Sequence, residues 1–332
     1  MRRSVAFTLT LATVVLAGCG GKTIIGGVPT PSPPFVPSVT NEFAIPTAAS
    51  FPLGIINGPD GALWFTERDG DKIGRMTVAG KFTEYVVPTA AASPTNIAVG
   101  ADGNLWFTEN QANKIGKITT AGAITEYAVP TLNSAPMGIA AGPDGNVWFT
   151  EQSSGNLGKI TTAGVVTEYP TSPSAGPLAI TTGFDGALWF TEGGSNAVGR
   201  LTTSGGFQQF PVLTPASSPN FITRGPDAAL WFTERLTSPG KIGRISVTGA
   251  ITEFALVGSN PIGITAAADG NLYATEAAPG AGKIARITTS GTVTEYPLPM
   301  PNAFPVLIVP GPDNELYFTE ASANKIGRFA FF

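Results

Sequence analysis

One pattern of about 42 residues recurs from residue 41 onward, and it limits the possible fold more than any other feature of the chain. A representative copy, PMGIAAGPDGNVWFTEQSSGNLGKITTAGVVTEYP, begins at Pro136. The glutamate that ends its aromatic run recurs at spacings of 42, 42, 41, 42, 42 and 44 residues, at Glu67, Glu109, Glu151, Glu192, Glu234, Glu276 and Glu320. Seven copies of this length predict a seven-bladed β-propeller, because a four-stranded blade needs about this many residues.

Each copy divides into four short segments with strand character, which in the representative copy are GIAAG, NVWFTE, LGKITT and VVTEY. An Asp-Gly turn separates the first two segments, and both of its residues tolerate positive φ, as a tight hairpin requires. An Ala-Gly turn separates the last two. The pattern therefore predicts an all-β fold with four antiparallel strands in each blade.

The two ends of the repeat region complement each other. The last copy stops after its third segment, IGRFAFF, and lacks the fourth. A segment of the missing type, Asn41-Glu42-Phe43, precedes the first copy. We therefore expect the N-terminal strand to complete the last blade, which would close the ring and remove its open edges.

The N-terminus has the features of an export signal. Arg2 and Arg3 precede an apolar stretch, residues 4–16, that ends in Leu16-Ala17-Gly18-Cys19 and resembles the lipobox of bacterial lipoproteins. We expect a signal peptide at 1–18, a lipidated Cys19 with a Pro/Gly-rich tether at 19–40, and the propeller at 41–332. The alternatives are a secretory signal followed by a chance cysteine and a cysteine buried in a core.

These features predict a location outside the cytoplasm. We expect export and lipid anchoring to the bacterial cell envelope, at the outer membrane if the cell is Gram-negative, because no aspartate follows Cys19. The net charge is only -4 and no run of Lys or Arg occurs outside the N-terminus, so nucleic acid is not an expected partner. We expect a monomer that contacts the membrane through Cys19 and an unidentified small-molecule or protein ligand.

Most charges belong to the repeat. Twenty of the 23 acidic residues occupy three repeated positions, in the Asp-Gly turn, at the end of the second segment and in the fourth segment. A basic residue recurs in the third segment, at Arg75, Lys117, Lys159, Arg200, Arg244, Arg286 and Arg328. We expect these bases to pair with the fourth-segment glutamates across strands. Only Asp69, Asp71 and Glu315 fall outside the acidic pattern.

Two repeated positions allow two interpretations each. The aromatic ring at Trp64, Trp106, Trp148, Trp189, Trp231, Tyr273 and Tyr317 is expected to pack between blades, with ligand stacking as the alternative. The glutamates that end the second segments are expected at the face where propellers carry ligands. They would either accept hydrogen bonds from N–H groups of their own blade, which we favour, or bind a cation.

The strings LWFTE, NKIGR/KITTxGxITEY and Pro-x-Gly-Ile resemble the streptogramin B lyase (virginiamycin B lyase) family over residues 41–332. The resemblance implies a seven-bladed propeller that opens a cyclic depsipeptide antibiotic by elimination with Mg²⁺. It also implies two catalytic histidines at the x of Pro-x-Gly-Ile in neighbouring blades, and a glutamate two residues before the second. The corresponding residues here are Ile262, Val306 and Phe304, and the chain contains no histidine.

Apolar side chains cannot exchange protons, so the lyase mechanism cannot be inherited intact. We therefore expect no catalytic residue, no metal site and no cofactor, and a propeller that binds a ligand or protein without converting it. The alternatives are a lyase with a rebuilt site, which would need Mg²⁺, and an envelope-structural role. The candidate ligand face is marked by blade-specific residues and their neighbours, Glu67, Arg68, Asn220, Glu234 and Arg235, with solvated loop charges as the simpler interpretation of the arginines.

Overall fold

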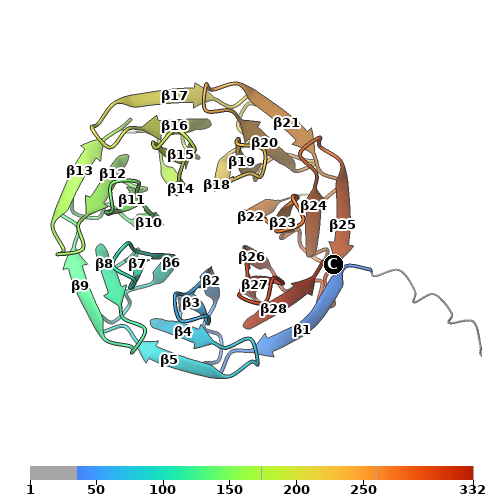
Figure 1. Cartoon of the computed structure of the whole chain (residues 1–332), viewed down its shortest axis with the longest axis horizontal. Helices are drawn as coiled ribbons and strands as arrows, with labels where there is room; N and C mark the ends of the chain where they lie inside the picture. Colours follow the sequence, from blue (N-terminus) through green and yellow to red (C-terminus); the bar gives the residue numbers. More distant parts are fainter. Residues whose placement is uncertain (1–35, 173, 259, 332) are drawn as a thin grey trace, which may run out of the picture. The chain divides into compact units, whose positions relative to one another are not determined.

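The computed structural model describes residues 36–172, 174–258 and 260–331, in which every regular element is a β-strand. Seven four-stranded antiparallel sheets stand around a central axis (Figure 1). The prediction of an all-β, seven-bladed propeller with four antiparallel strands per blade is thus confirmed. Among the described residues, no helix has the length and apolarity needed to cross a bilayer.

Each blade contributes one strand to each of four positions between the axis and the rim. The innermost strands are β2 (Pro52–Asn57), β6 (Pro94–Val99), β10 (Pro136–Ala141), β14 (Pro177–Thr182), β18 (Pro219–Arg224), β22 (Pro261–Ala266) and β26 (Pro305–Pro310). The second strands are β3 (Leu63–Glu67), β7 (Leu105–Glu109), β11 (Val147–Glu151), β15 (Leu188–Glu192), β19 (Leu230–Glu234), β23 (Leu272–Glu276) and β27 (Leu316–Glu320). The third strands are β4 (Lys72–Met76), β8 (Lys114–Ile118), β12 (Asn156–Ile160), β16 (Ala197–Leu201), β20 (Lys241–Ile245), β24 (Lys283–Ile287) and β28 (Lys325–Ala330). The outer strands are β5 (Phe82–Val86), β9 (Ile124–Ala128), β13 (Val166–Pro170), β17 (Phe207–Pro211), β21 (Ile251–Ala255), β25 (Val293–Pro297) and β1 (Ser38–Ala44).

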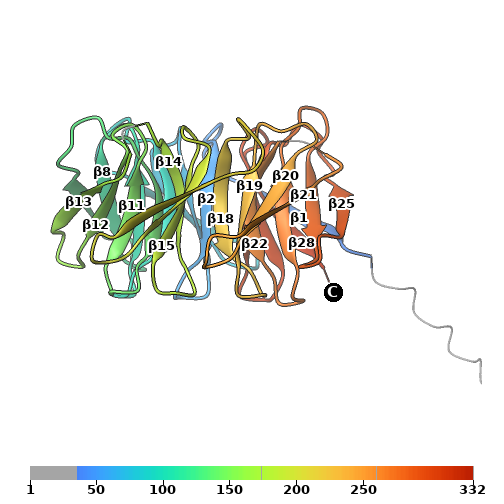
Figure 2. The ribbon, with the colours of Figure 1, turned by 90° about the horizontal axis from the view of Figure 1, so that it is seen from above.

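The connections lie on two faces of the ring (Figure 2). The loops from second to third strands, and from each outer strand to the next blade, share one face, which we call the loop face. The tight turns between first and second strands and between third and outer strands share the other, the turn face. Blades are numbered along the chain from blade 1 (β2–β5) to blade 7, which combines β26, β27 and β28 with β1.

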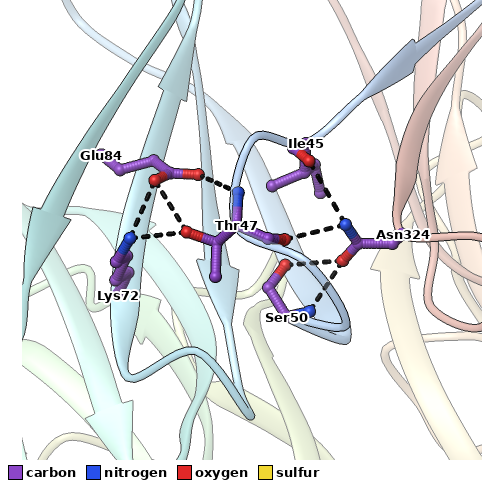
Figure 3. Close-up of polar contacts among 6 residues, drawn as sticks. All are labelled: Ile45, Thr47, Ser50, Lys72, Glu84 and Asn324. Carbon is purple, nitrogen blue, oxygen red and sulfur yellow. Dashed lines mark hydrogen bonds and ion pairs between the residues drawn. The ribbon is translucent and has the colours of Figure 1, made fainter.

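The ring is closed by the start of the chain. Strand β1 pairs antiparallel with β28, with Glu42 opposite Gly327, which confirms the expected closure. β1 begins at Ser38, three residues before the expected boundary at 41, because a bulge near Thr40 lets pairing continue to Ala330. The following loop is held on both sides (Figure 3): Asn324 of blade 7 binds Ser50, and Glu84 of blade 1 binds the backbone N–H of Thr47.

A bulge recurs at the start of every innermost strand. Two residues of that strand, which are Leu53 and Gly54 in blade 1, lie opposite the single residue Thr66 of the second strand, so their backbone groups leave the ladder. The threonine hydroxyl replaces the lost partners. Thr66 Oγ1 accepts from Gly54 N–H of its own blade at 2.8 Å and donates to the Thr95 carbonyl of the next blade at 2.9 Å.

These hydroxyls form a closed belt around the axis. All seven second-strand threonines donate to the carbonyl at the bulge of the following blade, and Thr319 of blade 7 completes the circuit by donating to Leu53 O of blade 1 at 2.8 Å. Each of these threonines is fully buried. The belt therefore couples every blade to its neighbour through hydrogen bonds that water cannot replace.

The aromatic ring of each blade packs against the next blade, as expected. Trp64 is fully buried in a cluster with Ile97, Leu105 and Phe107 of blade 2. Its indole N–H donates to the turn aspartate Asp60 at 2.9 Å, so burial leaves no donor unpaired.

The third-strand bases have a different partner from the one expected. Arg75 pairs with the turn aspartate Asp60 at 2.7 Å, and the same Asp–base pair recurs in the other six blades. The expected pairing with the fourth-segment glutamate is wrong because Arg75 lies opposite Thr83, while Glu84 lies opposite Gly74 and projects from the other side of the sheet.

The outer-strand glutamates pair instead with a lysine at the first position of the third strand. Lys72 Nζ lies 2.9 Å from Glu84 Oε2, and the same pair occurs in blades 2, 5, 6 and 7. Lys72 also donates to the Thr47 hydroxyl (Figure 3), so this pair fixes the loop that enters the blade. Blade 3 has Asn156 at the lysine position, and blade 4 has Ala197 there.

The glutamates that end the second strands are fully buried. We expected their carboxylates to accept hydrogen bonds from N–H groups of their own blade, and this is wrong for five of them, which accept no N–H group of any described residue: Glu67, Glu109, Glu234, Glu276 and Glu320. No group of three or more metal-ligating His, Cys, Asp or Glu side chains occurs among the described residues. Burial, followed by the like charge of Glu126, raises the pKa of Glu109 to about 8, so this carboxyl is largely protonated at neutral pH.

The belt makes a testable contribution to stability. Replacing Thr233 by Val keeps the side-chain shape but leaves Phe221 N–H and Ile262 C=O without a partner. We expect a loss of about 2 kcal/mol or more in the free energy of unfolding. The control Thr233→Ser keeps the hydroxyl and is expected to lose only about 0.8 kcal/mol for one buried methyl group. Equal denaturant midpoints for the two variants would contradict a bonding role for the hydroxyl.

The buried carboxyls predict a stability that falls with rising pH. The pKa of Glu109 rises from 4.5 to about 8, and those of Glu67, Glu151, Glu234, Glu276 and Glu320 also rise, to about 7 or 8. Between pH 5 and 8 the folded state holds protons that the unfolded chain has released, so the free energy of unfolding decreases through this window. Groups with lowered pKa, such as Asp60, lose their contribution only below about pH 4.

Replacing Glu109 by Gln is expected to flatten this dependence by up to about 1.4 kcal/mol per pH unit, because one titrating group is removed. Thermal unfolding between pH 5 and 8.5 measures the slope. The control Glu315→Gln removes an acid that pairs with Arg328 at the turn face, so it separates the loss of a buried carboxyl from the loss of one negative charge. An unaltered slope in the Glu109 variant would contradict the assignment.

Candidate functional site

The bulge at the start of each innermost strand positions the side chain at the x of Pro-x-Gly-Ile and its equivalents. Because the bulged residue leaves the regular ladder, its side chain is re-aimed toward the axis at the loop face. Seven such side chains surround one cavity of about 470 Å³, a size that holds a small-molecule ligand. They are Leu53, Thr95, Met137, Leu178, Asn220, Ile262 and Val306.

One side of the cavity is apolar. Ile262 and Val306, the residues that the family resemblance aligns with its two histidines, are buried in a cluster against Ala277 and Ala321. Phe304, the third, is half-buried and packs on this cluster. Its ring lies 6.4 Å from the ring of Phe51. The structure thus brings together, on one wall, the three residues that the resemblance aligns with catalytic groups.

Uncharged polar side chains complete much of the remaining wall. They include Thr95, Asn96, Gln152, Ser218 and Asn220. The hydroxyls of Thr95 and Thr108 are 2.8 Å apart, and Asn96 Oδ1 accepts the N–H of Ile97 at 2.9 Å. These contacts fix two of the polar groups before any ligand arrives, which favours orientation of a ligand by hydrogen bonds.

Two arginines, Arg68 and Arg235, reach the cavity from the loops that follow the second strands. Arg68 lies 4.0 Å above the ring of Phe51 and forms an ion pair with Asp69 at 2.7 Å. Arg235 donates from Nε to Asn260 Oδ1 at 3.0 Å. A polar recess of about 430 Å³ adjoins the cavity over blades 1 to 3 and shares Arg68 with it.

The remaining candidate residues lie elsewhere. Glu67 and Glu234 were expected at the ligand face, but both are fully buried and do not line the cavity. They end strands that are buried on both sides, so their carboxyls point into the blade rather than to the axis. Asp71 has a local role, because its two oxygens accept the N–H groups of Ala91 and Ser93.

Several lining residues were not recognised in the sequence. Phe221 and Leu307 directly follow x positions, and Phe51 precedes one by two residues. A signal for Phe51 was present, because most other blades have a small residue at that position. The bulge that turns these residues toward the axis could not be recognised from strand periodicity.

The cavity wall lacks groups that exchange protons near neutral pH. Its only charged side chains are the two guanidinium groups, which stay protonated, and the rest are aliphatic, aromatic, hydroxyl, amide or thioether groups. The lining within the described residues therefore has the means to bind and orient a ligand, but no general acid or base.

Comparison with known proteins gives the same fold and family. The sequence profile of the Virginiamycin B lyase family matches residues 36–175 and 171–331. A structure of streptogramin B lyase is 39% identical, with a TM-score of 0.82, covering 87% of this chain and 96% of that one. Virginiamycin B lyase from Staphylococcus aureus is 40% identical, with a TM-score of 0.83 over 88% of this chain and 99% of that one.

A further structure shows a catalytically inactive histidine-to-alanine variant of the Staphylococcus aureus lyase with quinupristin. It has the same identity of 40%, TM-score of 0.83 and coverage of 88% and 99%. The match extends over all seven blades rather than over a shared fold alone. On the family profile and on these identities, the chain belongs to the virginiamycin B lyase family.

Proposed function

We propose that this protein is a non-catalytic binding module of the cell envelope, which holds an amphipathic small molecule or a short segment of a protein in its central cavity. The observation that carries the proposal is the composition of the cavity wall, which combines apolar surface with amides and guanidinium groups but has no proton-exchanging group. The chain as a whole has no histidine.

The relatives support binding without turnover. Replacement of one histidine accompanies the loss of catalysis in the Staphylococcus aureus lyase, and that inactive protein is described with quinupristin. The positions at which the resemblance places catalytic groups are Ile262, Phe304 and Val306 here. A ligand can therefore occupy this kind of scaffold without the residue needed for its conversion.

The cavity does not suit the Mg²⁺ that the family resemblance implies. Proteins bind Mg²⁺ through one or two carboxylates in an octahedral set of oxygens, and no Asp or Glu lines the cavity among the described residues. We therefore assign no step to a metal ion. Mg²⁺ belongs to the alternative of a lyase with a rebuilt site.

The composition of the cavity wall predicts binding without turnover. Incubated with quinupristin, with and without Mg²⁺, the purified propeller is expected to bind without opening the ring, since no side chain at the cavity can remove a proton. Calorimetry measures binding, and mass spectrometry measures ring opening. The variant Asn220→Trp fills the cavity and is expected to weaken binding at least tenfold. Catalytic ring opening would favour the rebuilt lyase, most directly if Glu67→Gln abolished it.

We also propose that the protein is lipidated at Cys19, which lies outside the described residues, and is thereby attached to the membrane. Replacing Cys19 by Ser is expected to prevent incorporation of radioactive palmitate in a bacterial host and to move the protein from the membrane to the soluble fraction. If the wild-type protein and the Cys19→Ser variant are both exported and both fractionate as soluble proteins, the segment is an ordinary secretory signal instead. The control Ser38→Ala leaves the lipobox intact and is expected to behave as wild type.

A further inference from the structure

A strained backbone position recurs at the rim of the cavity. The residue two before each x position has a positive φ between 52° and 59° in all seven blades: Phe51, Ser93, Ala135, Gly176, Ser218, Asn260 and Phe304. This left-handed conformation is favourable for Gly and acceptable for Asn, but it is unfavourable for a bulky residue. The blade needs the backbone angle and not a side chain, as Gly176 demonstrates.

Two blades nevertheless have phenylalanine there. Phe51 and Phe304 belong to neighbouring blades, 1 and 7, and both line the cavity in a half-buried state. Their rings lie 6.4 Å apart with an angle of 42° between their planes. Since the backbone would be more stable with glycine at both positions, the benefit of these residues lies in the rings.

The rings are placed where a ligand can contact them. Arg68 lies over Phe51 at 4.0 Å and so holds this ring in place from one side. An aromatic ring prefers neighbours at centroid distances of about 4.5–7 Å in offset or tilted geometry, and two rings set at an angle offer such contacts to a third.

Among the described residues, the cavity wall carries one positive charge that is not neutralised by a neighbouring carboxylate. Arg68 is neutralised by Asp69, whereas Arg235 makes a hydrogen bond to the neutral amide of Asn260 and forms no ion pair within the described part of the chain. A guanidinium without a carboxylate, beside an apolar wall, favours a ligand that brings its own negative charge.

We propose that Phe51 and Phe304 form an aromatic platform that selects a ligand with a flat aromatic ring, and that Arg235 gives preference to ligands that also bear an anionic group. This inference rests on the proposed binding function of the cavity and specifies the chemical class of its ligand.

Packing is the competing role for the two rings, because they also cover the cluster around Ile262 and Val306. The two roles predict different consequences of glycine substitution. Glycine removes the ring and also relieves the strained backbone. If the rings served packing alone, their loss would lower the melting temperature and leave ligand selection unaffected.

The experiment uses two fluorescent probes with the same type of aromatic system. 1-Anilinonaphthalene-8-sulfonate is anionic, and N-phenyl-1-naphthylamine is neutral. We expect the double variant Phe51→Gly/Phe304→Gly to bind both probes at least tenfold more weakly, with a melting temperature within about 3 °C of wild type. We expect Arg235→Gln to weaken only the anionic probe, about fivefold.

Phe184 provides a matched control. Its ring is exposed at the turn face and lies 4.1 Å from the guanidinium of Arg224, which reproduces the Arg–Phe contact away from the cavity. Phe184→Ala is expected to leave the affinity for both probes unchanged. If Phe184→Ala lost as much affinity as the double variant, the aromatic platform would be refuted. The probes would then bind to any exposed Arg–Phe pair rather than to the cavity.

The cavity-filling variant Asn220→Trp separates failure of this inference from failure of the proposed function. If it abolishes probe binding while the double glycine variant retains full affinity, the cavity binds ligands but the aromatic platform is refuted. If neither variant changes the affinity, the probes bind elsewhere, and the inference and the proposed binding site both fail. A large fall in melting temperature with unchanged probe affinity would assign the rings to packing.

Discussion

The bulge at the start of each innermost strand and the threonine hydroxyl that satisfies it are the interaction on which the rest of the molecule depends. The bulge turns one side chain of each blade toward the axis, and without a partner its two backbone groups would be buried and unpaired. The threonine supplies both bonds and in doing so links successive blades, with Thr319 returning to Leu53. One local irregularity thus builds the cavity wall and couples the sheets that surround it.

The buried carboxyls show how the repeat tolerates charge. In blade 2, Lys114 at the start of the third strand pairs with the outer-strand carboxylate of Glu126. The buried carboxyl of Glu109 lies near this carboxylate, and its pKa is raised. Blade 4 has lost the lysine and also the outer acid. There Gln209 donates its amide to Glu192 in place of a like charge. Blade 3 also lacks the lysine but keeps its outer acid, Glu168, which accepts the N–H and hydroxyl of Thr131 instead, so the lysine is not the only possible partner of this carboxylate.

The features that all seven copies share could be predicted from the sequence. The number of blades, the closing strand and the packing role of the aromatic ring all follow from seven aligned copies. The positions that meet at the axis did not follow from the repeat, because they depend on a bulge that strand periodicity does not reveal. The partners of the charged residues did not follow, because they depend on which side of a strand a residue faces. Arg75 reaches back to Asp60 in a turn fifteen residues earlier, while Lys72, only three residues away, faces Glu84. The exposure of Glu67 was misjudged for a related reason, since its strand is covered on both sides.

Closure by β1 also sets a direction. The strand starts at Ser38 beside Ala330, near the turn face, and runs to Ala44 beside Lys325, near the loop face. The cavity opens at the loop face, so the chain enters the propeller at the end of the axis remote from the opening. The first residues of the closing strand therefore lie away from the cavity, so a ligand can enter at the loop face without disturbing the strand pairs that begin at Ser38.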